Sequence, residues 1–199
     1  IIKSSNEEFY ESVHIQGGGW FKFYEETENT ILELTDDFTL QIWFSGQEQT
    51  DDEAACIASL QGNSSNISIY RNPNINNVIM IYENEELIRE MEFDNMNLSE
   101  KNNFYLLSII REENELTVYM NDSIITNDDD TPLIIENTEA LNSIIGANLQ
   151  SSNAPENLWY GYIDEIRLWD EALTDTVIKF HNQYPTKLSD AYFDNDNDT

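Results

Sequence analysis

Short runs of alternating apolar and polar residues recur along the chain, separated by clusters of Asn, Asp, Gly and Ser. Such alternation is typical of strands in an antiparallel sandwich or barrel. It predicts strands over residues 10–15, 20–24, 31–34, 38–44, 54–60, 67–70, 78–82, 87–93, 104–111, 116–120, 143–147 and 160–169. Only the stretch 170–185 favours a helix, with Thr174 as its N-cap and Pro185 at its end. The pattern therefore predicts an all-β protein with one short C-terminal helix.

Two predicted strands carry further information. In FTLQIWF, residues 38–44, the even-numbered positions share one face and the odd-numbered positions, including Trp43, share the other. We expect the first face to belong to the core and the second to be a candidate floor for a ligand site. Residues 104–120 are expected to form a hairpin that turns at residues 112–115.

Length and composition favour one domain. The chain has 199 residues, of which 40% are hydrophobic, and this is enough apolar material for one substantial core. Hydrophobic periodicity is lost after Pro185, where acidic residues accumulate. We therefore predict a domain over residues 1–185 and an acidic linker or tail over residues 186–199, as expected for one module of a larger multidomain protein.

The charge of the chain narrows the choice of partners. Asp and Glu number 39 against nine Lys and Arg, which gives a formal net charge of -30. Nucleic acids and anionic membranes bind through Lys and Arg, so neither is an expected partner. The sequence has no run of 18 apolar residues, so membrane insertion is not expected. The single cysteine, Cys56, lies in an apolar strand and is expected to behave as a small buried hydrophobe.

Three segments resemble a known family. Residues 159–173, WYGYIDEIRLWDEAL, resemble the closing strand of laminin-G-like domains of the concanavalin A-like lectin and glucanase superfamily. The segments QGGGWFKF with ILELTDDFTLQIWF, and FYLLSIIREENELTVYMNDSII, are similar to the opening strands and the central hairpin of that family. The resemblance covers residues 13–184. It implies a two-sheet antiparallel jelly-roll sandwich located outside the cell or at its surface.

The same resemblance implies a structural Ca²⁺ site. In related domains the Asp of the closing strand binds Ca²⁺ together with backbone carbonyls near the first strands, and here these are Asp164 and the carbonyls of Gly17, Gly18 and Gly19. The alternative is an Asp164 that is hydrogen-bonded to turn amides or paired with Arg167. Alternation fails around Asp164, which predicts a β-bulge at this point.

Catalytic patterns are incomplete. Glycan hydrolases of this fold place two or more carboxylates on one strand, whereas EFDNMN offers Glu92 and Asp94 but has Met96 and Asn97 where another acid is needed. The two histidines lack metal-ligand spacing. We therefore predict no enzyme activity. A glycan hydrolase or lyase with an unrecognised site, and a structural spacer, remain the alternatives.

Aromatic residues are the remaining candidates for ligand contact, because sugar rings stack on them. Trp159 and Tyr160, beside the polar loop 147–157, are the first choice for a binding site, together with Trp43. Trp20, Tyr70 and Tyr82 are further candidates. The sequence thus predicts a non-catalytic extracellular recognition or adhesion module, assisted by Ca²⁺, that binds a glycan or a cell-surface protein.

Overall fold

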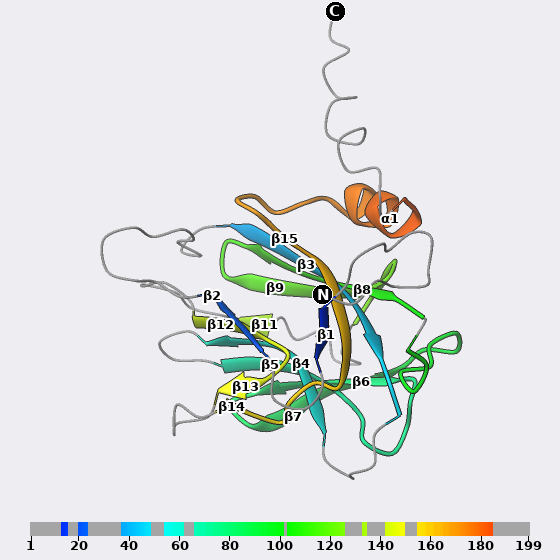
Figure 1. Cartoon of the computed structure of the whole chain (residues 1–199). Coiled ribbons are helices and arrows are strands. Elements are labelled where there is room, and N and C mark those ends of the chain that lie inside the picture. The colour runs from blue at the N-terminus through cyan, green and yellow to red at the C-terminus, as the bar shows by residue number, and fades with distance from the viewer. Residues whose placement is uncertain are drawn as a thin grey trace, which may run out of the picture.

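The computed structural model describes residues 13–15, 20–23, 37–48, 54–61, 66–101, 103–125, 133–134, 142–149 and 155–184. Two antiparallel sheets face each other as the layers of a sandwich (Figure 1). The first sheet has the order β1 (Val13–Ile15), β15 (Gly161–Trp169), β3 (Phe38–Gly46), β8 (Tyr105–Glu112), β9 (Glu115–Met120) and β10 (Ser123–Ile124), and β11 (Leu133–Ile134) also pairs with β9. The last described strand, β15, thus lies between β1 and β3.

The second sheet has the order β2 (Phe21–Phe23), β12 (Asn142–Ile145), β4 (Ala55–Gln61), β5 (Asn66–Arg71), β6 (Val78–Glu83) and β7 (Glu86–Glu92). A small ladder of β13 (Asn148–Leu149) and β14 (Pro155–Glu156) follows β12. Strands that are neighbours in sequence therefore fall in different sheets at several points. The predicted jelly-roll sandwich is confirmed.

The core lies between the two sheets and follows the alternation of the strands. The even-numbered residues of β3, from Phe38 to Phe44, are at most 1% exposed and pack against inward residues of the second sheet such as Ile57, Ile69 and Ile81. Burying such side chains is the main favourable term in folding, at about 25 cal/mol per Å² of apolar surface. The face of β3 expected to belong to the core therefore does.

The opposite face of β3 is also buried, which corrects the prediction that it forms a ligand floor. Helix α1 (Asp175–Gln183) lies on the side of the first sheet that faces away from the second sheet (Figure 1). Ile178 and Leu173 pack there against Ile110 and Tyr119 of strands β8 and β9. The apolar stripe of the helix covers this outer face, so the sheet is enclosed on both sides.

The helix begins where it was predicted, but not through the expected hydrogen bond. Thr174 occupies the N-cap position, and its side chain makes no capping hydrogen bond. Its carbonyl instead accepts the N–H groups of Val177 and Ile178, at 2.9 and 3.1 Å. The helix has nine residues. No helix in the described part of the chain is long and apolar enough to cross a membrane.

Most predicted strands are present within one or two residues of their expected bounds, and the hairpin of β8 and β9 turns at Glu113 and Asn114, as predicted. The strand expected over residues 31–34 and the tail over residues 186–199 lie outside the described residues. The two-residue strands β10, β11, β13 and β14 were not predicted. They are too short to leave a pattern of alternation.

Candidate functional site

A cavity of about 230 Å³ opens on the outer face of the six-stranded sheet. Residues from five places in the chain line it: Ala54, Asn66, Ser68, Tyr70, Tyr82, Glu85, Asn148 and Asn157. They belong to the position just before β4, to β5, to β6 and the turn after it, to β13 and to the segment after β14. The cavity is therefore built on a rigid sheet and closed at one side by a loop.

Strand alternation brings these side chains to one face. In β5, Ile67 and Ile69 point into the core, so Ser68 and Tyr70 between and after them point outward. Ser68 pairs in register with Tyr82 of β6. The alternation of β5 thus places the polar Ser68 directly beside the aromatic Tyr82 on the outer face of the sheet.

A network of neutral hydrogen bonds forms the polar side of the cavity. The Ser59 hydroxyl, from β4, lies 3.1 Å from the Oδ1 atoms of Asn66 and Asn148 and 3.1 Å from the Ser68 hydroxyl. The Ser68 hydroxyl lies 3.3 Å from the same two Oδ1 atoms. Because serine hydroxyls satisfy both side-chain oxygens, the amide groups of Asn66 and Asn148 present their Nδ2 donors elsewhere.

Two tyrosines form the aromatic side. The rings of Tyr70 and Tyr82 pack edge to face with centroids 5.2 Å apart. Burial, and then the nearby Cys56, raise the pKa of the Tyr70 hydroxyl, so it remains a protonated donor at neutral pH. Side-chain hydrogen bonds with Ser68 and Asn148 oppose part of this rise. Tyr82 is half-buried and contributes the more accessible ring.

Cys56 supports the tyrosines from below. It is 0% exposed and packs with Tyr70, Val78 and Met80, as predicted for a small hydrophobe. Burial raises the pKa of its thiol well above the usual value, which keeps the sulfur protonated. Cys56 is therefore a packing residue of the cavity floor.

A bulge in β4 positions the loop that closes the cavity. Register shifts between Cys56 and Ala58, which leaves the backbone of this region to pair outside the ladder. The Cys56 N–H donates to the Asn157 carbonyl at 2.7 Å, and the Gly146 N–H donates to the Ile57 carbonyl at 2.9 Å. These two bonds hold Asn157 and the start of β13 against the sheet.

One lining residue carries a charge. Glu85 lies in the turn between β6 and β7, where Asn84 and Glu85 have positive φ angles of 49° and 70°. The Asn84 side chain accepts the Asn66 N–H at 2.9 Å, so this turn is tied to the start of β5. Among the described lining residues the cavity thus combines neutral polar groups, two aromatic rings and one carboxylate.

The structure corrects the prediction for Trp159. Its side chain is 0% exposed and packs edge to face on Phe44 in the core, with centroids 5.4 Å apart. It follows a polar loop in sequence, but it points between the sheets. Its neighbour Tyr160 is half-buried and does not line the cavity. The loop beside them, by contrast, supplies Asn148 and Asn157 to the cavity, so the segment was identified correctly and the residue was not.

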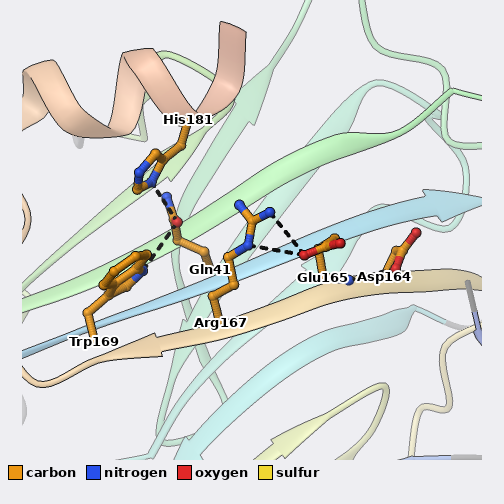
Figure 2. Close-up of polar contacts among 6 residues, drawn as sticks. All are labelled: Gln41, Asp164, Glu165, Arg167, Trp169 and His181. Atoms are coloured by element: carbon orange, nitrogen blue, oxygen red, sulfur yellow. Dashed lines mark hydrogen bonds and ion pairs between the residues drawn. The ribbon is translucent and has the colours of Figure 1, made fainter. Parts of the chain in front are cut away.

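The prediction that Trp43 contacts a ligand is also wrong. Its side chain is 4% exposed and packs with Leu106 and Phe104 on the outer face of the first sheet. Two positions earlier in β3, on the same face of the strand, Gln41 is buried beneath α1. Figure 2 shows how Gln41 lies between His181 of the helix and Trp169 of β15, where its Oε1 atom is 2.9 Å from His181 Nδ1.

Asp164 lies at a bulge of β15, as predicted. Register with β3 shifts between Asp164 and Arg167, and Glu165 has a positive φ angle of 46°. Asp164 Oδ1 accepts the Glu165 N–H at 2.8 Å, and Arg167 donates two hydrogen bonds to Glu165 Oε2, at 3.0 and 3.2 Å (Figure 2). Asp164 therefore has a structural role, as the acceptor that holds the bulge.

The described part of the chain contains no cluster of acidic side chains that could by itself hold a metal ion. Ca²⁺ takes six to eight oxygen ligands, and no group of three or more His, Cys, Asp or Glu side chains in the described part of the chain is arranged to hold a metal. Gly17, Gly18 and Gly19 lie outside the described residues. The predicted joint site of Asp164 and the three glycine carbonyls therefore stays a prediction.

The carboxylates of the incomplete catalytic pattern do not meet in the cavity. Glu92 is exposed and accepts a hydrogen bond from Asn77 at 3.1 Å, and Asp94 is exposed in the following turn. Met96 is 5% exposed and belongs to the core. The described cavity lining contains Glu85 alone among acids, and a glycosidase needs two facing carboxyl groups.

Sequence reasoning named Tyr70 and Tyr82 as aromatic candidates but missed the polar residues around them. Ser59, Ser68, Asn66 and Asn148 are among the commonest residue types in the loops of this chain, so nothing in the sequence distinguishes them. The available signal was the alternation NISIYR in β5, which puts Asn66, Ser68 and Tyr70 on one face.

Comparisons with known proteins agree with this architecture. The family model described as the Concanavalin A-like lectin/glucanases superfamily matches residues 17–179. No curated protein sequence matches the chain. The CBM40 domain of the Ruminococcus gnavus IT-sialidase superposes with a TM-score of 0.60 at 12% identity, over 86% of this chain and 96% of that domain. Two further structures show that domain bound to alpha2,3 and alpha2,6 sialyllactose.

Two other solved structures share the fold. The SAP-like pentraxin from Limulus polyphemus superposes with a TM-score of 0.50 at 15% identity, over 74% of this chain and 70% of the pentraxin. The NanB sialidase from Streptococcus pneumoniae superposes with a TM-score of 0.52 at 18% identity, over 72% of this chain and 23% of the sialidase. At these identities the likeness concerns the arrangement of the strands.

Proposed function

We propose that this chain, which belongs to the concanavalin A-like lectin/glucanases superfamily, is a non-catalytic extracellular module that binds a glycan in the cavity on the outer face of its six-stranded sheet. The observation that carries the proposal is the composition of that cavity. It places the Tyr70 and Tyr82 rings next to a network of neutral hydroxyl and amide groups.

This combination suits a sugar. The C–H faces of a pyranose ring stack on aromatic side chains, and its hydroxyl groups exchange hydrogen bonds with planar amides. In this cavity the half-buried Tyr82 offers the ring, and the Ser68 hydroxyl and the side-chain amides of Asn66 and Asn148 offer the polar groups. The sheet holds both kinds of group at fixed positions, which lowers the entropy cost of binding.

The size of the cavity favours a glycan over a protein partner. A stable protein interface buries about 800 Å² on each side, whereas this site is a compact hollow of about 230 Å³. The fold of the CBM40 domain supports the same choice, because that domain binds sialyllactose on a similar sandwich. Binding to a surface protein would then take place through the glycan that the protein carries.

The non-catalytic part of the proposal rests on the acids. Both glycosidase mechanisms need two carboxyl groups on either side of the scissile bond. The described cavity lining supplies only Glu85, which sits in an exposed turn. The test is incubation of the protein with a panel of polysaccharides, and release of new reducing ends would contradict this part of the proposal. A sialidase such as NanB is a suitable positive control, since 23% of its length shares the fold.

A glycan array followed by titration calorimetry tests the proposal. We expect specific binding to at least one glycan, and we expect Tyr82→Ala to weaken it about tenfold, which corresponds to about 1.4 kcal/mol. Asn148→Ala should also weaken binding, because it removes an amide of the network. Tyr184→Ala is the matched control, since Tyr184 is exposed at the end of α1 beyond the opposite sheet.

Two results would overturn the proposal. The first is the absence of specific binding to any glycan by the folded wild-type chain. The second is specific binding that neither Tyr82→Ala nor Asn148→Ala weakens more than Tyr184→Ala does, because the ligand would then occupy another surface.

A further inference from the structure

The polar groups that the described residues supply to the cavity are neutral or negatively charged. Hydroxyls and amides of Ser68, Asn66, Asn148 and Asn157 surround the tyrosine pair, and Glu85 adds a carboxylate. Neutral donors and acceptors match the hydroxyl groups of an uncharged sugar. A ligand carboxylate or sulfate would instead lose its water shell beside Glu85, at a cost that normally requires a cationic partner.

The sequence next to the lining residues extends this trend. Residues 49–53 precede Ala54 and read QTDDE, residues 62–65 precede Asn66 and read GNSS, and residues 150–154 lie between β13 and β14 and read QSSNA. These three segments carry three acids and no Lys or Arg. They add negative charge, and no cation, to the sequence that adjoins the lining residues.

Two of the described cations bind backbone carbonyls on the core side of the second sheet. Arg71 donates to the carbonyls of Gln47 and Leu98 at 2.9 and 3.1 Å, and Arg89 donates to the Ile125 carbonyl at 3.1 Å. Both side chains lie on the core side of their strands, opposite to the cavity. They hold the rims of the sandwich together by binding backbone carbonyls.

Three of the remaining described cations pair with groups outside the lining. Arg111 binds Asn114 in the β8–β9 hairpin, Arg167 pairs with Glu165 in the bulge of the first sheet, and Lys179 pairs with Asp175 on α1. Lys101 is exposed between β7 and β8. Lys22 of β2 pairs in register with Ile144 of β12, which in turn pairs with Ser59 of β4.

The volume of the cavity adds a limit on size. Pockets that enclose drug-sized ligands measure about 300–1,000 Å³. A hollow of about 230 Å³, with Glu85 and Asn157 at its borders, matches one sugar residue in size. Recognition of a single residue is typical of binding at the end of a glycan chain.

We infer that the cavity recognises one uncharged terminal sugar residue and discriminates against glycans that end in a carboxylate or a sulfate ester. The inference rests on the proposed function and specifies its ligand. It separates this chain from the CBM40 domain, which shares its fold and binds sialyllactose. Glu85 is the residue that enforces the discrimination inside the cavity.

Matched pairs of glycans test this inference. The array should contain the same neutral oligosaccharides with and without a terminal sialic acid, and with and without terminal sulfation. We expect binding to neutral members, and we expect capping with either acidic group to weaken it at least tenfold at low ionic strength. Equal or tighter binding of the acidic members would overturn the inference and leave the proposed function intact. Absence of binding to every member would instead overturn the proposed function.

Two charge-matched variants then assign the effect to Glu85. Glu85→Gln removes one negative charge from the cavity, and Glu112→Gln removes one from the exposed end of β8 in the opposite sheet. We expect Glu85→Gln to reduce the preference for the neutral member of a pair by about threefold to tenfold, and Glu112→Gln to leave it unchanged. An equal shift in both variants would mean that the net charge of the chain, and not the cavity, excludes acidic glycans.

Discussion

At the scale of single residues, Gln41 connects the first sheet to the helix that covers it. Its Nε2 donates to the Ser108 hydroxyl at 3.2 Å, and its Oε1 accepts from Trp169 Nε1 and lies 2.9 Å from His181 Nδ1. The imidazole also stacks on the Trp169 ring, with centroids 5.5 Å apart. Because Gln41 is 0% exposed, these partners satisfy an amide that would otherwise be buried at a cost.

His181 makes the attachment of α1 sensitive to acid. Burial, and then the nearby Arg167, lower its pKa from 6.5 to about 4. As pH falls below 6.5 the unfolded chain therefore binds a proton that the folded chain does not. Stability contributed by the neutral imidazole is present above pH 6.5 and is lost down to about pH 4, at up to about 1.4 kcal/mol per pH unit.

We expect His181→Gln to remove most of that dependence, because an amide can still donate to Gln41 and does not titrate. Urea unfolding at pH 7 and pH 4.5 measures the loss of stability in each protein. The loss should be smaller in the variant by about 2 kcal/mol. The same loss in both proteins would show that protonation of His181 is not resisted by the fold.

Asp164 offers a second prediction at this scale. As the acceptor of the Glu165 N–H, it should tolerate Asn, which retains the acceptor oxygen, whereas Asp164→Ala should lower the free energy of unfolding by about 1 kcal/mol. Urea unfolding of the two variants measures the difference.

The predicted calcium site at Asp164 adds a separate test. Calcium should raise the unfolding temperature of EDTA-treated wild-type protein more than that of Asp164→Asn. No heat of calcium binding, with no rise in the unfolding temperature, would contradict a metal at this position.

At the scale of elements, the pairing of β15 with β3 depends on two glycines that face each other. Gly161 and Gly46 are partners in the ladder. Gly161 has a φ angle of +153°, and a Cβ atom there would clash with the Ser45 carbonyl oxygen and lie 2.9 Å from Trp159 Nε1. The same glycine therefore lets β15 approach β3 and leaves room for the buried indole.

Gly161→Ala should for this reason destabilise the fold by roughly 1–3 kcal/mol, through overpacking at a strained backbone position. Thr117→Ala, at a half-buried position of β9, is a suitable strand control with a smaller expected effect. Denaturant midpoints of the two variants make the comparison. A Gly161→Ala protein as stable as the wild type would mean that the strands can separate locally without cost.

At the scale of the whole molecule, the formal charge of -30 opposes folding, because like charges come closer together in the compact state. Salt should therefore stabilise this protein. Raising sodium chloride from about 0.01 M to about 1 M shortens the Debye length from about 30 Å to about 3 Å. We expect the unfolding temperature at pH 7 to rise by several degrees over this range.

The control for the salt effect is acidity. Near the sequence pI of about 4.1 the net charge is close to zero, so the increase should largely disappear. An increase of the same size at both pH values would indicate a general salting-out effect on apolar surface and not relief of charge repulsion.

Most of the architecture could be predicted from the chain alone, for a physical reason that β3 and β5 illustrate. Successive residues of a strand point to opposite sides of the sheet. A run such as NISIYR therefore indicates which residues belong to the core and which face outward, wherever the strand lies. The closing strand could be identified by its resemblance to a known family, and its bulge at Asp164 could be predicted because alternation fails there. Local sequence determines these features because local backbone geometry produces them.

The site required the tertiary structure. Trp159 and Trp43 are residues of a type that often contacts sugars. Both are nevertheless buried, Trp159 between the sheets and Trp43 on the outer face of the first sheet. Whether an outward-facing residue is exposed depends on what covers its sheet: α1 covers β3, whereas the outer face of β5 keeps a cavity. The meeting of Ser59, Ser68 and Asn148 depends on contacts between residues up to 89 positions apart. Sequence by itself thus determined the strands, their faces and the family, and only the packing of distant segments decided which face remained open to bind.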